Sequence, residues 1–100
     1  MATVELARDT YLPAAPLWEA IGIHPDDDID MHTHWIKGSK LIAMRVGVSK
    51  EAIRRWAEKD EIHYLKADRA ACRLGLHPMT VWGDDWLRIS PSHKEIYRHA

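Results

Sequence analysis

The chain is poor in cysteine, has no phenylalanine and lacks any long hydrophobic run. Its single cysteine, Cys72, excludes an internal disulfide and any zinc module built from several cysteines. No apolar stretch approaches the length that spans a bilayer, which excludes a transmembrane helix. The N-terminal sequence shows no basic segment followed by an apolar block, so we expect no secretory signal and a cytoplasmic location.

The 100 residues are enough for one compact domain and too few for a second hydrophobic core. We expect a flexible N-terminal arm over residues 1–10, a folded domain over residues 11–90 and a C-terminal tail over residues 91–100.

Charge is distributed unevenly along the chain, although the net charge is only −1. Residues 1–30 carry one basic and seven acidic side chains, a net charge of −6. Residues 31–77 carry ten basic and five acidic side chains, a net charge of +5, and residues 78–100 are balanced. A basic middle segment is the electrostatic pattern expected of a nucleic-acid-binding region.

Apolar residues recur at helical spacing, with glycine or proline near the boundaries, and no sustained period-two alternation is visible. The sequence therefore predicts an all-α fold, a compact domain of four to five helices that contains a helix-turn-helix. Polar residues 24–32 are expected to form a loop, with room for one turn of helix around Ile29, and residues 60–64 a connector. The expected helices cover residues 16–21, 39–46, 50–58, 67–74 and 79–82 or slightly beyond.

Residues 39–58 fit a helix-turn-helix unit in detail. Two helices that cross steeply around a tight turn need a residue that tolerates positive φ, which Gly47 supplies. The crossing also needs a small residue on the first helix, which Ala43 supplies. Apolar side chains at the remaining inner positions would lock the two helices together: Ile42, Val46, Val48, Ile53 and Trp56.

The second helix of this unit separates cleanly into an apolar stripe and a charged stripe at 100° per residue. In a DNA major groove, Arg54 and Arg55 could donate paired hydrogen bonds to guanine, and Glu51 could accept from cytosine. Lys50 completes this candidate base-reading set.

Other residues around the unit suit the DNA backbone. Ser49 begins the second helix, where backbone amides and the helix dipole favour a phosphate. Four basic residues are further candidate phosphate contacts: Lys37, Lys40, Arg45 and Lys59. The alternative is a solvated helix face held by ion pairs between Glu51 and Arg55 and between Arg54 and Glu58.

Two stretches resemble small helix-turn-helix DNA-binding proteins of actinobacteria and their phages, of the lambda-repressor-like or Cro-like type. One is Gly47-Val48-Ser49 with Ile53-Arg54-Arg55-Trp56; the other runs from Ala67-Asp68-Arg69 through Leu74-Gly75-Leu76-His77-Pro78 to Val81-Trp82 and Trp86. The resemblance covers residues 39–86. It implies a transcriptional regulator or phage control protein acting in a bacterial or phage-infected cytosol.

The predicted function is therefore sequence-specific binding of double-stranded DNA, with residues 50–58 in the major groove and a homodimer giving useful affinity. One alternative is a protein-interaction module, such as an antitoxin or anti-repressor, that uses the acidic N-terminal region or Trp86. Another is an excision factor that bends DNA. We assign Trp82 to the core and leave Trp86 open between core and interface.

Evidence for catalysis is weak. His32 and His34 lie near Asp28 and Asp30, but their spacing matches no specific metal motif. Cys72 is expected to be a buried structural thiol. Because no nucleophile triad, phosphate loop or carboxylate pair stands out, we expect no enzyme activity, no metal and no cofactor.

Overall fold

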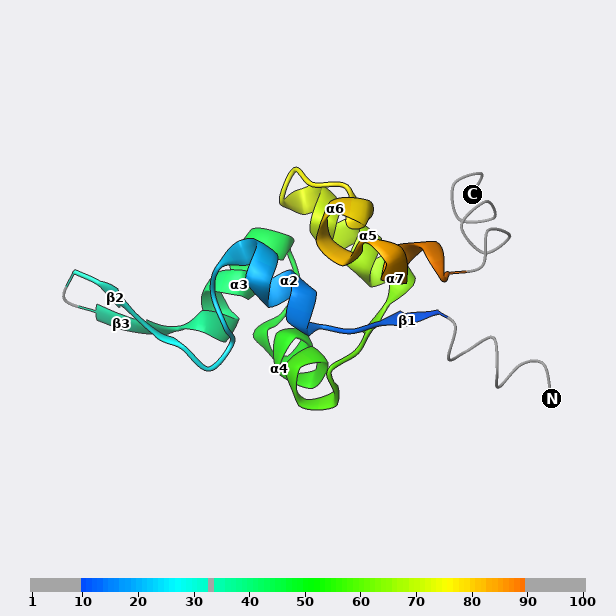
Figure 1. Ribbon diagram of the computed structural model, residues 1–100. Helices are drawn as coiled ribbons and strands as arrows, with labels where there is room; N and C mark the ends of the chain where they lie inside the picture. Colours follow the sequence, from blue (N-terminus) through cyan, green and yellow to red (C-terminus); the bar gives the residue numbers. More distant parts are fainter. Residues whose placement is uncertain (1–9, 33, 90–100) are drawn as a thin grey trace.

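The computed structural model describes residues 10–32 and 34–89, so residues 1–9 of the expected arm and the whole expected tail lie outside the described residues. Ten elements follow one another in this part of the chain (Figure 1). They are β1 (Tyr11–Leu12), α2 (Ala15–Ile21), β2 (Asp28–Met31), β3 (His34–Lys37), α3 (Gly38–Val46), α4 (Lys50–Lys59), β4 (Ile62–His63), α5 (Tyr64–Arg73), α6 (Pro78–Trp82) and α7 (Asp84–Leu87).

The prediction of an all-α fold with four to five helices is wrong. Within the described residues, six helices are accompanied by two small antiparallel sheets, one formed by β1 and β4 and the other by β2 and β3. Strands β1 and β4 have two residues each, and Tyr11 of β1 pairs with His63 of β4, far along the sequence. No local sequence pattern therefore predicts these two strands. The β2–β3 hairpin occupies most of the predicted polar loop, because alternating Asp and apolar residues in β2 form a strand with one acidic face.

Helices α3 and α4 form the predicted helix-turn-helix. Helix α3 ends at Gly47, whose φ of 73° is the left-handed conformation that the turn requires. The Ser49 side chain then caps α4 by accepting a hydrogen bond from the Ala52 amide at 3.1 Å. A side chain at position 47 would collide with the guanidinium of Arg73, so the turn also packs closely against α5.

The core joins all six helices to the β1–β4 sheet. Its largest fully buried side chains include Leu12, Leu17, Ile42, Ile53 and Ile62. Ala43, Val46 and Trp56 are buried as well, and Val48 packs against the core while partly exposed. The inner residues of the helix-turn-helix thus serve the domain core.

Four of the five tryptophans lie in this core: Trp18, Trp56, Trp82 and Trp86. The assignment of Trp82 to the core is confirmed, and its Nε1 donates a hydrogen bond to the Pro13 carbonyl at 2.7 Å. Trp86 is only 4% exposed and is therefore not available as a surface anchor for a partner. The exposed indole is that of Trp35, on β3, at 70%.

Two further expectations need correction. Helix α5 begins at Tyr64, three residues before the predicted start, because the His63 side chain caps it by accepting from the Leu65 amide. Cys72 is exposed, because position 72 lies beside the buried face of α5, which is formed by Tyr64, Ala67, Asp68, Ala70 and Ala71. Its thiol donates to an Asp68 carboxylate oxygen at 3.6 Å.

None of the helices in residues 10–32 and 34–89 has the length and apolar character needed to cross a membrane.

Candidate nucleic-acid interface

Helix α4 presents a charged face that the core leaves uncovered. Ala52, Ile53 and Trp56 point inward and are buried. Six side chains are exposed on the opposite side: Lys50, Glu51, Arg54, Arg55, Glu58 and Lys59. Helix α4 therefore has the amphipathic character of a helix that can enter a groove.

The cations of this face are not engaged by the carboxylates of the same helix. Ion pairs between Glu51 and Arg55, or between Arg54 and Glu58, would explain the face as a self-neutralised surface. Neither pair is among the ion pairs formed within the part of the chain that the structure describes. The guanidinium groups of Arg54 and Arg55 thus form no ion pair within the described residues.

Helix α5 adds a second row of positive charge beside α4. Lys66, Arg69 and Arg73 follow one another at i, i+3 and i+7, which places them on one side of α5. Lys66 and Arg69 are exposed, while the Arg73 guanidinium lies over the turn at Gly47. The packing of α5 against α3 thereby brings α5 cations next to the helix-turn-helix.

Two shallow hollows between α4 and α5 show how closely these cations gather. The first, of about 250 Å³, is lined by Ser49, Arg55, Lys66 and Arg69 along with apolar residues. The second, of about 150 Å³, extends to the β1–β4 sheet and is lined by Arg55, Lys59 and Lys66 together with one carboxylate, that of Glu61. Since Arg55 and Lys66 line both hollows, they lie on the wall between them. We call Arg55, Lys59, Lys66 and Arg69 the α4–α5 basic surface.

The α5 cations were missed by sequence reasoning, although their spacing carries a signal. With the helix predicted to start at residue 67, Lys66 fell outside it and its register with Arg69 and Arg73 was lost. The earlier start, set by the His63 cap, restores that register.

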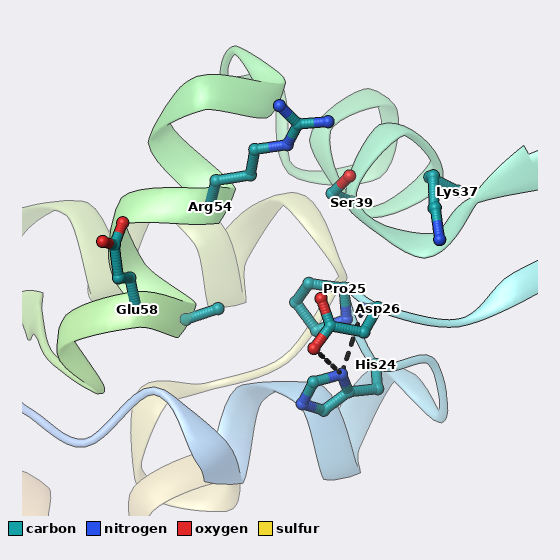
Figure 2. Close-up of a pocket in the computed structure, with 8 residues that line it drawn as sticks. His24, Pro25, Asp26, Lys37, Ser39, Arg54 and Glu58 are labelled. Atoms are coloured by element: carbon teal, nitrogen blue, oxygen red, sulfur yellow. Dashed lines mark hydrogen bonds and ion pairs between the residues drawn. The ribbon is translucent and has the colours of Figure 1, made fainter.

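Arg54 lies in different surroundings from Arg55. It lines a cavity of about 610 Å³ between α4 and the base of the hairpin, together with Asp26, Lys37 and Glu58 (Figure 2). Figure 2 shows Arg54 and Glu58 on the α4 side of this cavity, with His24 and Asp26 across it. Two carboxylates therefore face the same cavity as Arg54, whereas the hollows around Arg55 are dominated by cations.

The remaining candidate phosphate contacts are dispersed. Lys37 is on the hairpin, and its Nζ pairs with an Asp28 carboxylate oxygen at 2.9 Å. Lys40 and Arg45 are exposed on α3. Ser49 and Lys59 lie in the hollows beside α5. The structure thus gathers Ser49, Arg55 and Lys59 with α5 and leaves Lys37 paired within the hairpin.

Among residues 10–32 and 34–89, no three histidine, cysteine, aspartate or glutamate side chains lie close enough together to hold a metal ion.

Comparison of the chain with protein-family models, curated protein sequences and solved structures finds no match.

Proposed function

We propose that this protein binds double-stranded DNA sequence-specifically through α4 and acts, without catalysis, as a repressor-like or Cro-like regulator. The observation that carries the proposal is the α4–α5 basic surface beside a helix-turn-helix. Helix α4 is exposed on its charged side, its cations form no ion pairs within the described residues, and α5 supplies further cations alongside. Unpaired cations that flank a groove-reading helix suit a polyanion.

The surroundings of the two arginines support unequal roles for them in this proposal. Three cations and one carboxylate, that of Glu61, share the two hollows with Arg55, so a phosphate-rich groove relieves like-charge repulsion there. Arg54 shares its cavity with Asp26 and Glu58, which would repel nearby phosphates and compete with DNA for the guanidinium. In this proposal Arg55 is the principal base reader and Arg54 a lesser one.

The phosphate contacts follow from the same surface. Lys59, Lys66 and Arg69 flank Arg55 and would bind the backbone on the α5 side. Lys50 and Glu51, exposed in the first turn of α4, would reach base edges, and Ser49 would present the helix start to a phosphate.

Selection from a pool of random duplexes at about 0.15 M salt tests the proposal, because specificity has meaning only at a stated salt concentration. The wild-type chain is expected to enrich a motif. Arg55→Ala should weaken the free energy of binding to that motif by about 1–3 kcal/mol and relax the base preference at one position. Arg54→Ala is the matched variant on the same helix and should lose less.

No enrichment by a protein shown to be folded would contradict DNA reading. A larger loss for Arg54→Ala than for Arg55→Ala would refute the assignment of roles while leaving DNA binding intact. A bending assay on the enriched site would separate a regulator from an excision factor, which must deform the duplex.

A further inference from the structure

The β2–β3 hairpin is an arm that extends away from the helices (Figure 1). In the described residues, β2 and β3 pair only with each other, so each strand has one open edge. Trp35 is 70% exposed and Met31 is 49% exposed. An isolated two-stranded hairpin is marginal in water and gains stability from further strands or from packing. Exposed apolar side chains on an open edge mark this arm as an interaction surface.

The base of the arm is firmly attached to α3. The Gly38 amide donates to the Asp27 carbonyl at 2.7 Å, and the Ser39 amide donates to the Pro25 carbonyl at 2.9 Å. Gly38 packs so tightly on the His24 carbonyl oxygen that a side chain could not fit. The arm therefore projects in a direction set by the body of the domain.

The charge of the arm disfavours DNA as its partner. The hairpin itself, residues 28–37, contains two aspartates and one lysine, a net charge of −1, and Asp26 and Asp27 at its base bring residues 24–37 to −3. Asp30 is directly opposite Trp35 across the hairpin, so inserting this indole into DNA would bring a carboxylate toward the phosphates. A protein surface fits the arm better than a polyanion does.

The register of the hairpin distributes these residues over two faces. Cross-strand partners share a face. The pairs Asp28–Lys37 and Asp30–Trp35 lie on one face, and the pairs Ile29–Ile36 and Met31–His34 lie on the other.

Symmetry then decides which edge can pair with a copy of itself. In an antiparallel pair of identical strands, the two-fold axis is perpendicular to the sheet, so residues of one face oppose residues of the same face. For β2, the registers centred on Asp28, Ile29 or Asp30 set an aspartate against an aspartate of the partner subunit, and only the register centred on Met31, the last residue of the strand, does not. Like charges directly opposite one another destabilise a sheet, so most registers of the β2 edge are disfavoured for self-pairing.

The β3 edge carries no such conflict, because the sequence His34-Trp35-Ile36-Lys37 contains no carboxylate. With Ile36 on the axis, Trp35 lies opposite Lys37 of the partner subunit, an arrangement that permits a cation–π contact. With Trp35 on the axis, the two indoles meet and His34 lies opposite Ile36 of the partner subunit. Both registers are free of acid–acid repulsion.

We propose that two copies of this chain associate by antiparallel pairing of their β3 edges, which joins the two hairpins into one four-stranded sheet. The pairing satisfies open backbone groups and covers part of the exposed Trp35. It rests on the hairpin alone and does not depend on DNA binding.

Trp35→Lys tests the proposal sharply. Within its own hairpin the new lysine lies opposite Asp30, so the hairpin of a single copy gains a favourable charge pair. Across the interface it lies opposite a lysine in both registers, so the dimer is disfavoured. Met44→Lys is the matched control, because it removes an equally exposed apolar side chain, at 69%, from α3.

Sedimentation velocity over a concentration series, without DNA, gives the readout. Wild type and Met44→Lys should form dimers, and Trp35→Lys should dissociate at least tenfold more readily while retaining its circular dichroism. A monomeric wild type at all concentrations, or an equal loss for Met44→Lys, would overturn the proposal.

Disulfide trapping identifies the edge and the register, in a Cys72→Ser background. Ile36→Cys should cross-link two copies if Ile36 is on the axis, and Trp35→Cys should do so if Trp35 is. Asp30→Cys should not, because the two β2 strands would be three strand spacings apart, about 14 Å, which is too far for a disulfide. Rapid cross-linking of Asp30→Cys alone would refute pairing through β3.

Discussion

Replacing Lys66 and Arg69 by glutamine tests the part of the proposed DNA interface that the sequence did not predict. Both side chains are exposed and line the hollow that Arg55 and Ser49 share. If each neutralises one phosphate, the double variant should lose two released counterions. The slope of log K against log salt concentration should then become shallower by about 1.8, at about 0.9 per phosphate contact on duplex DNA.

The size of this change is readily measurable. When the salt concentration rises from about 50 mM to about 200 mM, the factor by which wild-type affinity falls should be about 12 times the factor for the double variant. It should be about 3.5 times the factor for Lys66→Gln alone. Fluorescence anisotropy on the selected duplex and on an unrelated duplex gives both slopes. Because phosphate contacts carry no sequence information, the change should be the same on both duplexes.

Arg88→Gln is the control for loss of a positive charge elsewhere. The Arg88 guanidinium is held by an Asp85 carboxylate oxygen at 2.8 Å, outside the α4–α5 basic surface. Its slope should equal that of the wild type. Exposed substitutions of this kind change stability by about 0.5 kcal/mol or less, so thermal melts should be unchanged. An unchanged slope for the double variant, or an equal change for Arg88→Gln, would refute the placement of the phosphate contacts.

Three further predictions concern the scaffold. Trp56→Ala should lower the free energy of unfolding by about 3–5 kcal/mol, because the indole is buried beneath α4; an unchanged urea midpoint would contradict that role. Gly38→Ala should lower the free energy of unfolding by about 1–3 kcal/mol, because the new side chain would force the His24 carbonyl away. Faster amide hydrogen exchange in the hairpin would show that its base has opened. Unchanged protection of those amides would argue against the clash. Asp60→Ala should lower the free energy of unfolding by about 1–2 kcal/mol in a thermal melt, because an Asp60 carboxylate oxygen accepts hydrogen bonds from the Ala14 and Ala15 amides at 3.1 and 3.2 Å. Asp60→Asn keeps an acceptor oxygen and should retain most of the stability. Equal losses for both variants would show that the acceptor oxygen is not what matters at this position.

Local sequence patterns were sufficient to predict the two helices and the turn of the helix-turn-helix. Gly47 supplies the left-handed turn, Ser49 the cap and Ile53 with Trp56 the inward stripe, and each effect operates within a few residues of chain. Such features are readable because helix geometry repeats every few residues and the hydrogen bonds that start and stop a helix are local.

The sheets, by contrast, could not be read in the same way. The β1–β4 pairing joins Tyr11 to His63, and its strands are too short to show any alternation. In the hairpin, the aspartates of β2 indicated a solvated loop, because a strand with one acidic face and little burial resembles a polar segment. The contacts that define these strands are made with residues elsewhere in the chain.

The sequence by itself determined that a charged, amphipathic helix follows a tight turn and that the middle of the chain is basic. Only the tertiary structure decided which charges meet. The packing of α5 against α3 gathers Lys66 and Arg69 around Arg55, while the segment before β2 places Asp26 in the lining of the cavity that Arg54 shares. The physical reason is that a helix period specifies which side chains share a face, whereas the neighbours of that face are set by how the core packs.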